Sequence, residues 1–301
     1  MLFYPEGTHC PTAPQSADAL TQGMREGAIY ESRALSCDAE RNLHFMLGHI
    51  AGVMPREECA IGVREGKVRD IAILSRVGRV TCFTVTGVCT DTPRPYAVLS
   101  RRLAQEQCLR AYLSGLVPGD ILPCRVTHLE TFGAFCDVGC GVSALLPIDC
   151  MSVSRIASPT DRFCEGQNIF CAVKCRDALG RLVLTTRELF GTWAENAAHF
   201  HAGETVLGVV RSVESYGVFI ELAPNLAGLA ESGLPVKCGQ TVSVFLKSIH
   251  PEKMKLKLAI LQITDAPAPM GCALFPTAGH LSRWVYSPPG AAKCIETLFD
   301  E

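Results

Sequence analysis

Two pairs of aromatic residues are the side chains of this sequence best suited to binding chemistry. Phe132 and Phe135 form the first pair, and Tyr216 and Phe219 form the second with the same spacing. Aromatic ring faces can stack on other flat rings, and stacking on one unpaired nucleic-acid base is worth about 1–3 kcal/mol. Tyr216 adds a hydroxyl group that can donate or accept a hydrogen bond.

A glycine directly follows the first ring of each pair. Positions three apart in a regular strand point to opposite faces, but Gly133 and Gly217 lie inside strand-like patterns. A glycine there usually marks a sharp bend or a close approach of two backbones. A bend would bring both rings to one surface, as a platform for two bases. Without it, one ring of each pair belongs to the core. The residues alone leave both alternatives open.

Three lysines, Lys247, Lys255 and Lys257, follow the second ring pair. Lys255 and Lys257 are two residues apart, so they share one face of a strand and could contact the phosphates along a nucleic-acid backbone. The alternative is a solvated strand edge, where lysine opposes aggregation. The net charge of −2 argues against binding to duplex DNA, which needs a basic face. It does not exclude single strands, whose affinity can come from stacking.

The ring pairs belong to an internal repeat. Val126–Val138 aligns with Val210–Leu222 without a gap. A Gly-Gln pair beginning at Gly166 and again at Gly239 matches at a shorter offset, so the second copy lacks a surface loop present in the first. A register kept over this length indicates duplicated structural units.

Each copy contains about five short runs in which apolar and polar residues alternate, as in half-buried strands of a small closed barrel. In the first copy we expect strands over Ile121–Leu129, Ala134–Val138, Ile169–Arg176 and Arg181–Thr185. Helix-forming residues outside the copies predict connectors over Arg101–Leu113, with Ser100 as N-cap, and over Thr186–Phe200.

The regions before and after the two copies are less regular. A short helix is expected over Ser16–Met24, followed by strands over 29–36, 42–54 and 79–88, which we interpret as a divergent third barrel. The tail from 266 to 301 is rich in Pro and Gly and is predicted to be irregular and to lie against the last barrel. Its His280, Trp284 and Tyr286 form either a further stacking patch or a hydrophobic lid.

Other functional classes lack their signatures. Gly-x-Ser-x-Gly, Walker-type and His-Glu-x-x-His motifs are missing, so we expect no enzymatic activity, no catalytic residue and no cofactor. The sixteen cysteines include no Cys-x-x-Cys, and Cys171 and Cys175 are expected as reduced core residues without a metal. No apolar run reaches the roughly 18 residues of a membrane helix, and no signal peptide is evident. These features favour a cytoplasmic protein.

The first copy closely resembles the S1 RNA-binding domain, an OB-fold domain of the ribosomal protein S1 family. The resemblance lies in Gly119-Asp120, Val126-Thr-x-Leu-x-x-Phe132-Gly-Ala-Phe135-x-Asp137-x-Gly139, Phe163-x-x-Gly166-Gln167 and Asp177-x-x-Gly180-Arg181-x-x-Leu184. It implies a nucleic-acid face made of Phe132, Phe135, Asp177 and Arg181. An aromatic residue or histidine common on the third strand of the family is replaced by Pro147.

The other two barrels depart from this pattern. The later copy keeps Tyr216 and Phe219, but His250 replaces the aspartate of the final hairpin, which carries Lys255 and Lys257 instead. In the N-terminal segment, aligning Gly52-Val-Met-Pro55 with Ala144-Leu-Leu-Pro147 places Glu40 and Leu43 at the ring positions. We therefore expect that barrel to bind RNA poorly and to serve as a protein-docking or spacing module.

The whole chain resembles short S1 homologues of anaerobic Gram-positive bacteria, including Leu-Ser-Arg-Arg-x-Ala-Gln over Leu99–Gln105. The expected fold is mainly β, with tandem five-stranded OB-type barrels joined by short helices. The expected segments are an extension (1–24), a divergent S1-like barrel (25–100), a connector helix (101–116), an S1 domain (117–187), a connector helix (188–201), an S1 domain with a shortened loop (202–263) and a tail (264–301).

The resemblance implies a protein of translation that binds single-stranded mRNA beside the small ribosomal subunit. The predicted RNA-binding residues are Phe132, Phe135, Asp177, Arg181, Tyr216, Phe219, Lys247, Lys255 and Lys257. Two other functions remain open. One is an RNA-binding post-transcriptional regulator that is not stably bound to the ribosome, and the other is a protein-interaction scaffold.

Overall fold

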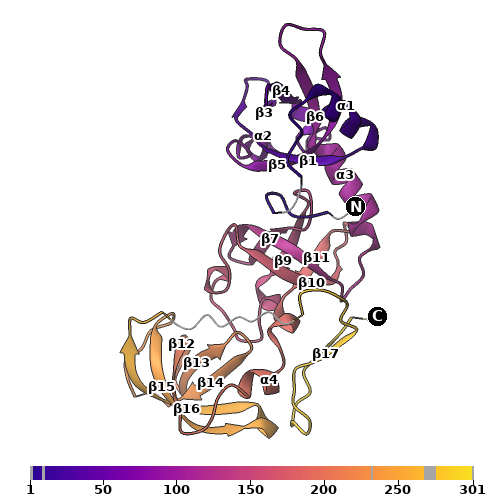
Figure 1. Ribbon diagram of the computed structural model, residues 1–301. Coiled ribbons are helices and arrows are strands. Elements are labelled where there is room, and N and C mark those ends of the chain that lie inside the picture. Colours follow the sequence, from indigo (N-terminus) through magenta and orange to yellow (C-terminus); the bar gives the residue numbers. More distant parts are fainter. Residues whose placement is uncertain (1–2, 9–10, 232, 268–275, 300–301) are drawn as a thin grey trace. The chain divides into compact units, whose positions relative to one another are not determined.

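The computed structural model describes residues 3–8, 11–231, 233–267 and 276–299, and most of its regular structure is β-strand. The chain forms two compact units. The first holds residues 1–116 together with 123–125 and 137–143, and the second holds the other residues. Figure 1 follows the element order from the indigo N-terminus to the yellow C-terminus.

A six-stranded sheet is the main feature of the first unit. Its strands are β1 (Ile29–Arg33), β2 (Ser36–Cys37), β3 (Leu43–Leu47), β4 (Ile50–Met54), β5 (Val80–Cys89) and β6 (Tyr96–Ser100), in the order β1-β5-β6-β4-β3-β2. Its helices are α1 (Ala17–Glu26), the 3-10 turn η1 (Arg56–Glu58) and α2 (Asp70–Leu74). The expected helix at the start of the chain is therefore present. It begins at Ser16, whose hydroxyl accepts a hydrogen bond from the Ala19 N–H.

This sheet differs from the predicted third barrel in one respect. β1 pairs with β5 and β2 pairs with β3, although only Ala34 and Leu35 separate β1 from β2. Together β1 and β2 occupy the place of one first strand, so the strand order is that of a five-stranded barrel whose first strand is interrupted. The N-terminal segment is thus an open sheet with barrel-like connectivity.

The middle barrel closes as the alternation predicts. After the connector helix α3 (Arg101–Ala111) and the turn η2 (Leu113–Gly115), the barrel comprises β7 (Ile121–Glu130), β8 (Gly133–Asp137), β9 (Ser143–Pro147), β10 (Asn168–Arg176) and β11 (Leu182–Thr185). The strand order is β10-β11-β9-β8-β7 with β7 and β10 adjacent. A long loop between β9 and β10 contains the 3-10 turns η3 (Ile148–Cys150) and η4 (Pro159–Asp161).

The connector predicted as one helix over 186–200 is shorter and divided. A 3-10 turn, η5 (Arg187–Phe190), is followed by the five-residue helix α4 (Trp193–Ala197). Gly191 between them has φ 79°, a conformation that ends the first turn. Thr192 then caps α4 through a reciprocal capping box with Glu195. The helix-forming composition was the right signal for a helix, but the backbone at Gly191 limits its length.

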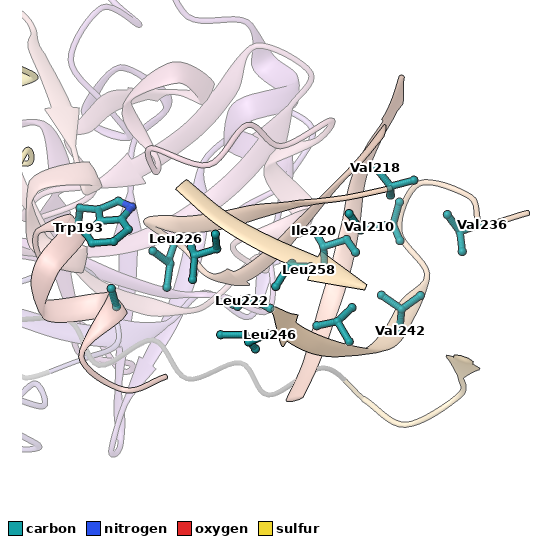
Figure 2. Packing of buried hydrophobic residues seen from close by; sticks show 14 of the residues in the cluster. Trp193, Val210, Val218, Ile220, Leu222, Leu226, Val236, Val242, Leu246 and Leu258 are labelled. Atoms are coloured by element: carbon teal, nitrogen blue, oxygen red, sulfur yellow. The ribbon is translucent and has the colours of Figure 1, made fainter. Parts of the chain in front are cut away.

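The third barrel is closed as well. Its strands are β12 (Thr205–Glu214), β13 (Gly217–Ala223), β14 (Leu226–Ala230), β15 (Thr241–His250) and β16 (Lys255–Thr264), with the turn η6 (Pro251–Lys253) joining the last two. Alternate residues of these strands fill the core, including Val210, Ile220 and Leu258 (Figure 2). Trp193 of α4 joins the same core, which attaches the connector to the barrel.

The tail is more ordered than its composition indicates. Its strands β17 (Arg283–Val285) and β18 (Glu296–Leu298) pair with each other, while residues 268–275 and 300–301 lie outside the described part. Trp284 and Tyr286 are 7% and 6% exposed and pack into the core of the third barrel. The hydrophobic-lid interpretation is therefore right for these two residues. His280 instead bonds Asp120, with 2.9 Å between Nδ1 and Oδ1.

A β-bulge recurs at the same place in all three sheets. The pairing shifts between Val85 and Gly87, between Val173 and Cys175, and between Leu246 and Ser248. A bulge reverses the alternation of side chains. For this reason Cys171 is buried but Cys175 is exposed, contrary to the expectation that both are core residues.

The cysteines that the structure describes are free thiols. No group of three or more potential metal ligands occurs among the described residues. In the same part of the chain, each helix is too short or too polar to cross a membrane.

Candidate nucleic-acid interface

The two aromatic pairs adopt the same geometry in the middle and third barrels. The ring centroids of Phe132 and Phe135 are 6.1 Å apart with an angle of 88° between the planes. The corresponding values for Tyr216 and Phe219 are 6.2 Å and 88°. Edge-to-face contacts of this kind are favourable for aromatic pairs. The structure therefore brings each predicted pair together.

The outer ring of each pair is open to solvent. Phe132 is 52% exposed and Tyr216 is 67% exposed, whereas Phe135 and Phe219 are half-buried. None of the four rings is sealed in a barrel core, so the core alternative is wrong. Each outer ring therefore offers exposed aromatic surface on which a base could stack.

Close backbone contact explains the glycine in each pair. A Cβ atom on Gly133 would come 2.5 Å from the carbonyl oxygen of Leu146, and one on Gly217 would come 2.6 Å from that of Ala230. Cβ atoms essentially never approach another heavy atom this closely, so any larger residue would push the strands apart. The glycines let β8 approach β9 and β13 approach β14, which sets the position of the ring that precedes each strand.

In the third barrel the ring pair forms part of a groove of about 670 Å³. Every residue of the third barrel that the sequence predicted for binding lines it, namely Tyr216, Phe219, Lys247, Lys255 and Lys257. The volume lies in the range of about 300–1,000 Å³ that is common for small-molecule sites. Rings and ammonium groups on one groove suit a ligand with both flat rings and negative charges.

The lysines of the groove carry available positive charge. Along β16, the exposed Lys255 and Lys257 alternate with the buried Leu256 and Leu258. The two lysines therefore share one face of the strand, as predicted. Within the described residues, no carboxylate pairs with either of these lysines. Lys247 lies in the bulge of β15, with its Nζ 3.5 Å from a carboxylate oxygen of the exposed Glu231.

In the middle barrel, Asp177 and Arg181 are held together by the hairpin between β10 and β11. Oδ1 of Asp177 accepts hydrogen bonds from the N–H groups of Leu179 and Arg181, both at 2.9 Å. Oδ2 accepts one from Nε of Arg181 at 2.7 Å. The backbone hydrogen bond from Arg181 and its guanidinium lower the pKa of Asp177. Asp177 therefore shapes the turn, while the Arg181 side chain, 67% exposed, remains available to a ligand.

The strand register relates the middle site to the third. β11 lies parallel to β9 with Val183 opposite Leu145, as β16 lies parallel to β14 with Lys257 opposite Leu229. Arg181 thus occupies the place of Lys255, on the sheet that carries the ring pair. Pro147 ends β9 and offers no ring at this edge.

The N-terminal sheet lacks such a pair, but the predicted alignment was wrong by one residue. Val53 of β4 lies opposite Val98 in the parallel pairing with β6. Leu229 holds the same place in the parallel pairing of β14 with β16, so Val53 is equivalent to Leu229. His44 faces Val53 as Phe219 faces Leu229, so His44 occupies the inner ring position. Leu43, which the sequence placed there, is fully buried. The β3–β4 hairpin lacks the bulge between Glu221 and Ala223 of the third barrel and has a shorter turn than the middle barrel, so a fixed sequence offset does not carry across it.

The outer ring position of this sheet falls to Arg41 instead of Glu40. Nε of Arg41 is 3.7 Å from the carboxylate of Asp70, and Nε2 of His44 is 2.9 Å from that of Asp38. Both side chains therefore interact with carboxylates at the surface. No phenyl or phenol ring stands at either position.

The lining of the third-barrel groove also includes residues outside the predicted RNA-binding set, among them Met254, Tyr286 and Ile295. Met254 follows η6 in a left-handed conformation with φ 48°. Tyr286 and Ile295 come from the tail, beyond the repeat. No pattern in the sequence connects Tyr286 and Ile295 with the ring pair, because only the packing of the tail brings them there.

No protein-family model matches the chain. Curated relatives are found. Small ribosomal subunit protein bS1 of Leuconostoc lactis is 28% identical over 194 residues, which cover 59% of this chain and 45% of that protein. The bS1 homolog of Bacillus subtilis (strain 168) is 29% identical over 194 residues, covering 59% and 50%. The bS1 protein of Staphylococcus aureus (strain COL) is 28% identical over 187 residues, covering 56% and 48%. The chain spans about half the length of the curated relatives it matches.

Among solved structures, the chain is similar to a multidomain protein with nucleic acid binding domains from Streptococcus pneumoniae. The similarity covers 78% of this chain and 74% of that one, with 10% identity and a TM-score of 0.25. The curated relatives, the internal repeat and the two closed barrels together support an OB-fold protein similar to the S1 family.

Proposed function

We propose that this chain binds single-stranded RNA, and mRNA in particular, through the ring pairs of its middle and third barrels. The observation that carries the proposal is the exposed edge-to-face pair that occurs in both barrels with the same geometry. An exposed ring next to a supporting ring gives an unpaired base a surface on which to stack, whatever its identity.

Charge supports a single strand over a duplex. The chain as a whole carries a net charge of −2, so it has no general attraction for a duplex. Positive charge is instead local, at Arg181 in the middle barrel and at Lys255 and Lys257 in the third. Arg181 directly precedes β11, and the two lysines lie in β16. β11 and β16 each neighbour the strand that pairs with the ring-bearing strand, an arrangement that suits stacked bases joined by phosphates.

The test is the affinity of the full chain for a labelled single-stranded RNA, measured by fluorescence anisotropy. Since each stacked base contributes about 1–3 kcal/mol, replacing Phe132 or Tyr216 by alanine should weaken binding by roughly tenfold or more. The combined variant should lose more than either alone. Phe245→Ala is the matched control, because Phe245 is 36% exposed on β15 and does not line the groove. Unchanged affinity in the combined variant would refute the proposal and favour a protein-interaction scaffold.

We further propose that the protein acts in translation at the small ribosomal subunit. The curated relatives bear the name small ribosomal subunit protein bS1. Two linked barrels that each bind weakly gain affinity for one RNA because the second binding step is intramolecular. Co-sedimentation of the full chain with purified small and large subunits tests this role. Binding of RNA without enrichment on the small subunit would favour the alternative of a regulator that works away from the ribosome.

A second proposal concerns the N-terminal sheet, as a protein-docking module. Met46 is 53% exposed and Tyr96 is 38% exposed, and both pair with Ala51, so they share an apolar surface. The positions of the stacking rings are held by Arg41 and His44, which are bound to carboxylates. Photo-crosslinking of RNA to the full chain should modify residues in the middle and third barrels. Abundant crosslinks within residues 29–100 would contradict a docking role without RNA.

The proposal includes no catalytic step and no cofactor. A cytoplasmic location is expected with it, since mRNA and small subunits are the proposed partners. Incubation of the chain with labelled RNA should leave the RNA length unchanged, and cleavage products that persist through purification would contradict the absence of activity.

A further inference from the structure

We infer that the C-terminal hairpin, formed by β17 and β18 and the loop between them, is part of the RNA-binding site of the third barrel and contacts the bound RNA directly. The inference rests on the proposed RNA binding. The hairpin lies beyond Thr264, where the last repeated strand ends, so it belongs to neither copy of the repeat. Its residues Tyr286 and Ile295 nevertheless line the same groove as Tyr216 and Phe219.

The base of the hairpin is fixed to the barrel by buried contacts. The hydroxyl of Tyr286 donates a hydrogen bond of 2.6 Å to the carbonyl oxygen of Asn225. The carbonyl oxygen of Tyr286 accepts one of 3.0 Å from the N–H of Trp193, and its N–H donates one of 2.9 Å to the carbonyl oxygen of Ile295. Tyr286 thus joins the groove wall to the core, and Ile295 is held beside it.

The loop of the hairpin is fixed to the turn between β15 and β16. The N–H of Ala292 donates a hydrogen bond of 3.0 Å to the carbonyl oxygen of Glu252 in η6. Within the loop, the hydroxyl of Ser287 donates to the carbonyl oxygen of Lys293 at 2.7 Å and accepts from the N–H of Ile295 at 2.8 Å. These bonds keep the loop next to Lys253, which lines the groove.

The groove therefore has two walls of different origin. The ring pair comes from the repeat, while Ile295 of the tail, together with Met254, adds an apolar surface. Both of these residues also pack against the barrel core, so the surface is supported from below. Lys253 and Lys255 flank Met254 in the sequence, and both are exposed. A base between the walls would keep its phosphate near these ammonium groups, so Ile295 is positioned to touch the strand.

The middle barrel offers a contrast. At the corresponding hairpin tip, Leu179 is 77% exposed, and Asp177 and Arg181 bond each other. The third barrel thereby gains contacts with the strand that the repeat does not provide.

A charge-reversal pair in the full chain tests the inference. Ile295→Glu and Ile295→Lys disturb the packing of the same side chain alike but place opposite charges in the groove. If the strand passes there, the glutamate variant should bind single-stranded RNA roughly 30-fold more weakly than the lysine variant at low salt, as expected for opposite charges near a phosphate. Leu298→Glu and Leu298→Lys are the controls, because Leu298 is 52% exposed in β18 outside the groove. They should differ from each other by less than about threefold, since exposed charges far from the strand are screened.

Direct contact is checked separately by crosslinking 4-thiouridine RNA to the unmodified chain, which should label the peptide around Ile295. Equal loss of affinity in both Ile295 variants would overturn the inference, since it would show that the tail acts only through folding. So would unchanged affinity in both while the unmodified chain binds RNA, an outcome that leaves the proposed function intact. An unmodified chain that fails to bind RNA would overturn the proposed function and the inference with it.

Discussion

Arg162 in the loop after β9 donates a hydrogen bond of 2.5 Å from Nη2 to the carboxylate of Glu221 in β13. The side chains are 3% and 5% exposed, so this ion pair between the middle and third barrels is buried. Arg211 of β12 bonds the same carboxylate and lies 3.1 Å from Asp161 of the loop. The loop that the third barrel lacks is therefore a contact between the two barrels and not the plain surface loop that the repeat indicated.

Glu221→Gln should destabilise the second unit. The substitution removes the charge that compensates the buried Arg162 and leaves Arg211 with Asp161 as its remaining carboxylate partner. Breaking a buried ion pair by removing one partner costs about 3–5 kcal/mol. Urea unfolding followed by hydrogen exchange in β12 and β13 measures the change. Glu214→Gln, at an exposed position of β12, is the control and should change the unfolding free energy by less than about 0.5 kcal/mol. A Glu221 variant as stable as this control would show that the pair contributes little.

Gly133→Ala should destabilise the middle barrel and weaken RNA binding together. The added methyl group would meet the carbonyl oxygen of Leu146 and force β8 away from β9, which moves Phe132. Inserting an atom into such a contact costs about 1–3 kcal/mol. Gly115→Ala is the matched control, because a Cβ atom there has no neighbour within 4 Å. Thermal unfolding and RNA anisotropy are measured on both variants, and equal effects would mean that backbone contact does not require Gly133.

The salt dependence of binding should reveal the lysines of the groove. For single-stranded nucleic acid, a plot of log affinity against log salt concentration has a slope of about −0.7 for each phosphate contact. Replacing both Lys255 and Lys257 by glutamine should therefore reduce the magnitude of this slope by about 1.4. Lys237→Gln removes an exposed lysine of the same barrel that does not line the groove, and its slope should match that of the unmodified chain. Slopes that do not differ would assign both lysines to the solvated edge.

His128 should titrate above the ordinary range for histidine. Its Nδ1 is 2.8 Å from Glu165 and its Nε2 is 3.0 Å from Glu130, and these hydrogen bonds raise the pKa of His128, with that of Glu165 having the larger effect. These hydrogen bonds stabilise the folded state fully below about pH 6.5, the pKa of histidine in the unfolded chain. This stabilisation is lost as the pH rises through the raised folded value. An NMR titration of the His128 ring measures the midpoint, and Glu165→Gln should lower it. A midpoint that Glu165→Gln leaves in place would contradict the assigned cause.

Local patterns were sufficient to predict much of the fold. The alternation of apolar and polar residues gave the strands of both closed barrels, since a strand with one buried face requires that period. Ser16 and Ser100 marked the starts of two helices correctly, because a capping hydroxyl acts within one turn of the chain. The ring pairs were recognisable for the same reason, as the residues of each pair lie only three positions apart.

Features that depend on contacts between distant segments were not predictable in this way. The alignment that placed Leu43 at a ring position failed because strand register follows cross-strand pairing, and the β3–β4 hairpin is one residue shorter between its paired positions than the later hairpins. The connector ended early at Gly191, whose backbone conformation no composition specifies. Ile295 reached the groove through packing of the tail, about which the repeat carries no information.

The sequence by itself determined the kind of domain and the chemistry of its side chains, because periodicity, glycine placement and residue type are local properties. Only the tertiary structure decided that the outer rings face solvent, that Asp177 shapes a turn, and that the tail shares the groove with Tyr216. Exposure and proximity depend on how segments far apart in the chain fold against one another, and no single stretch of residues encodes that arrangement.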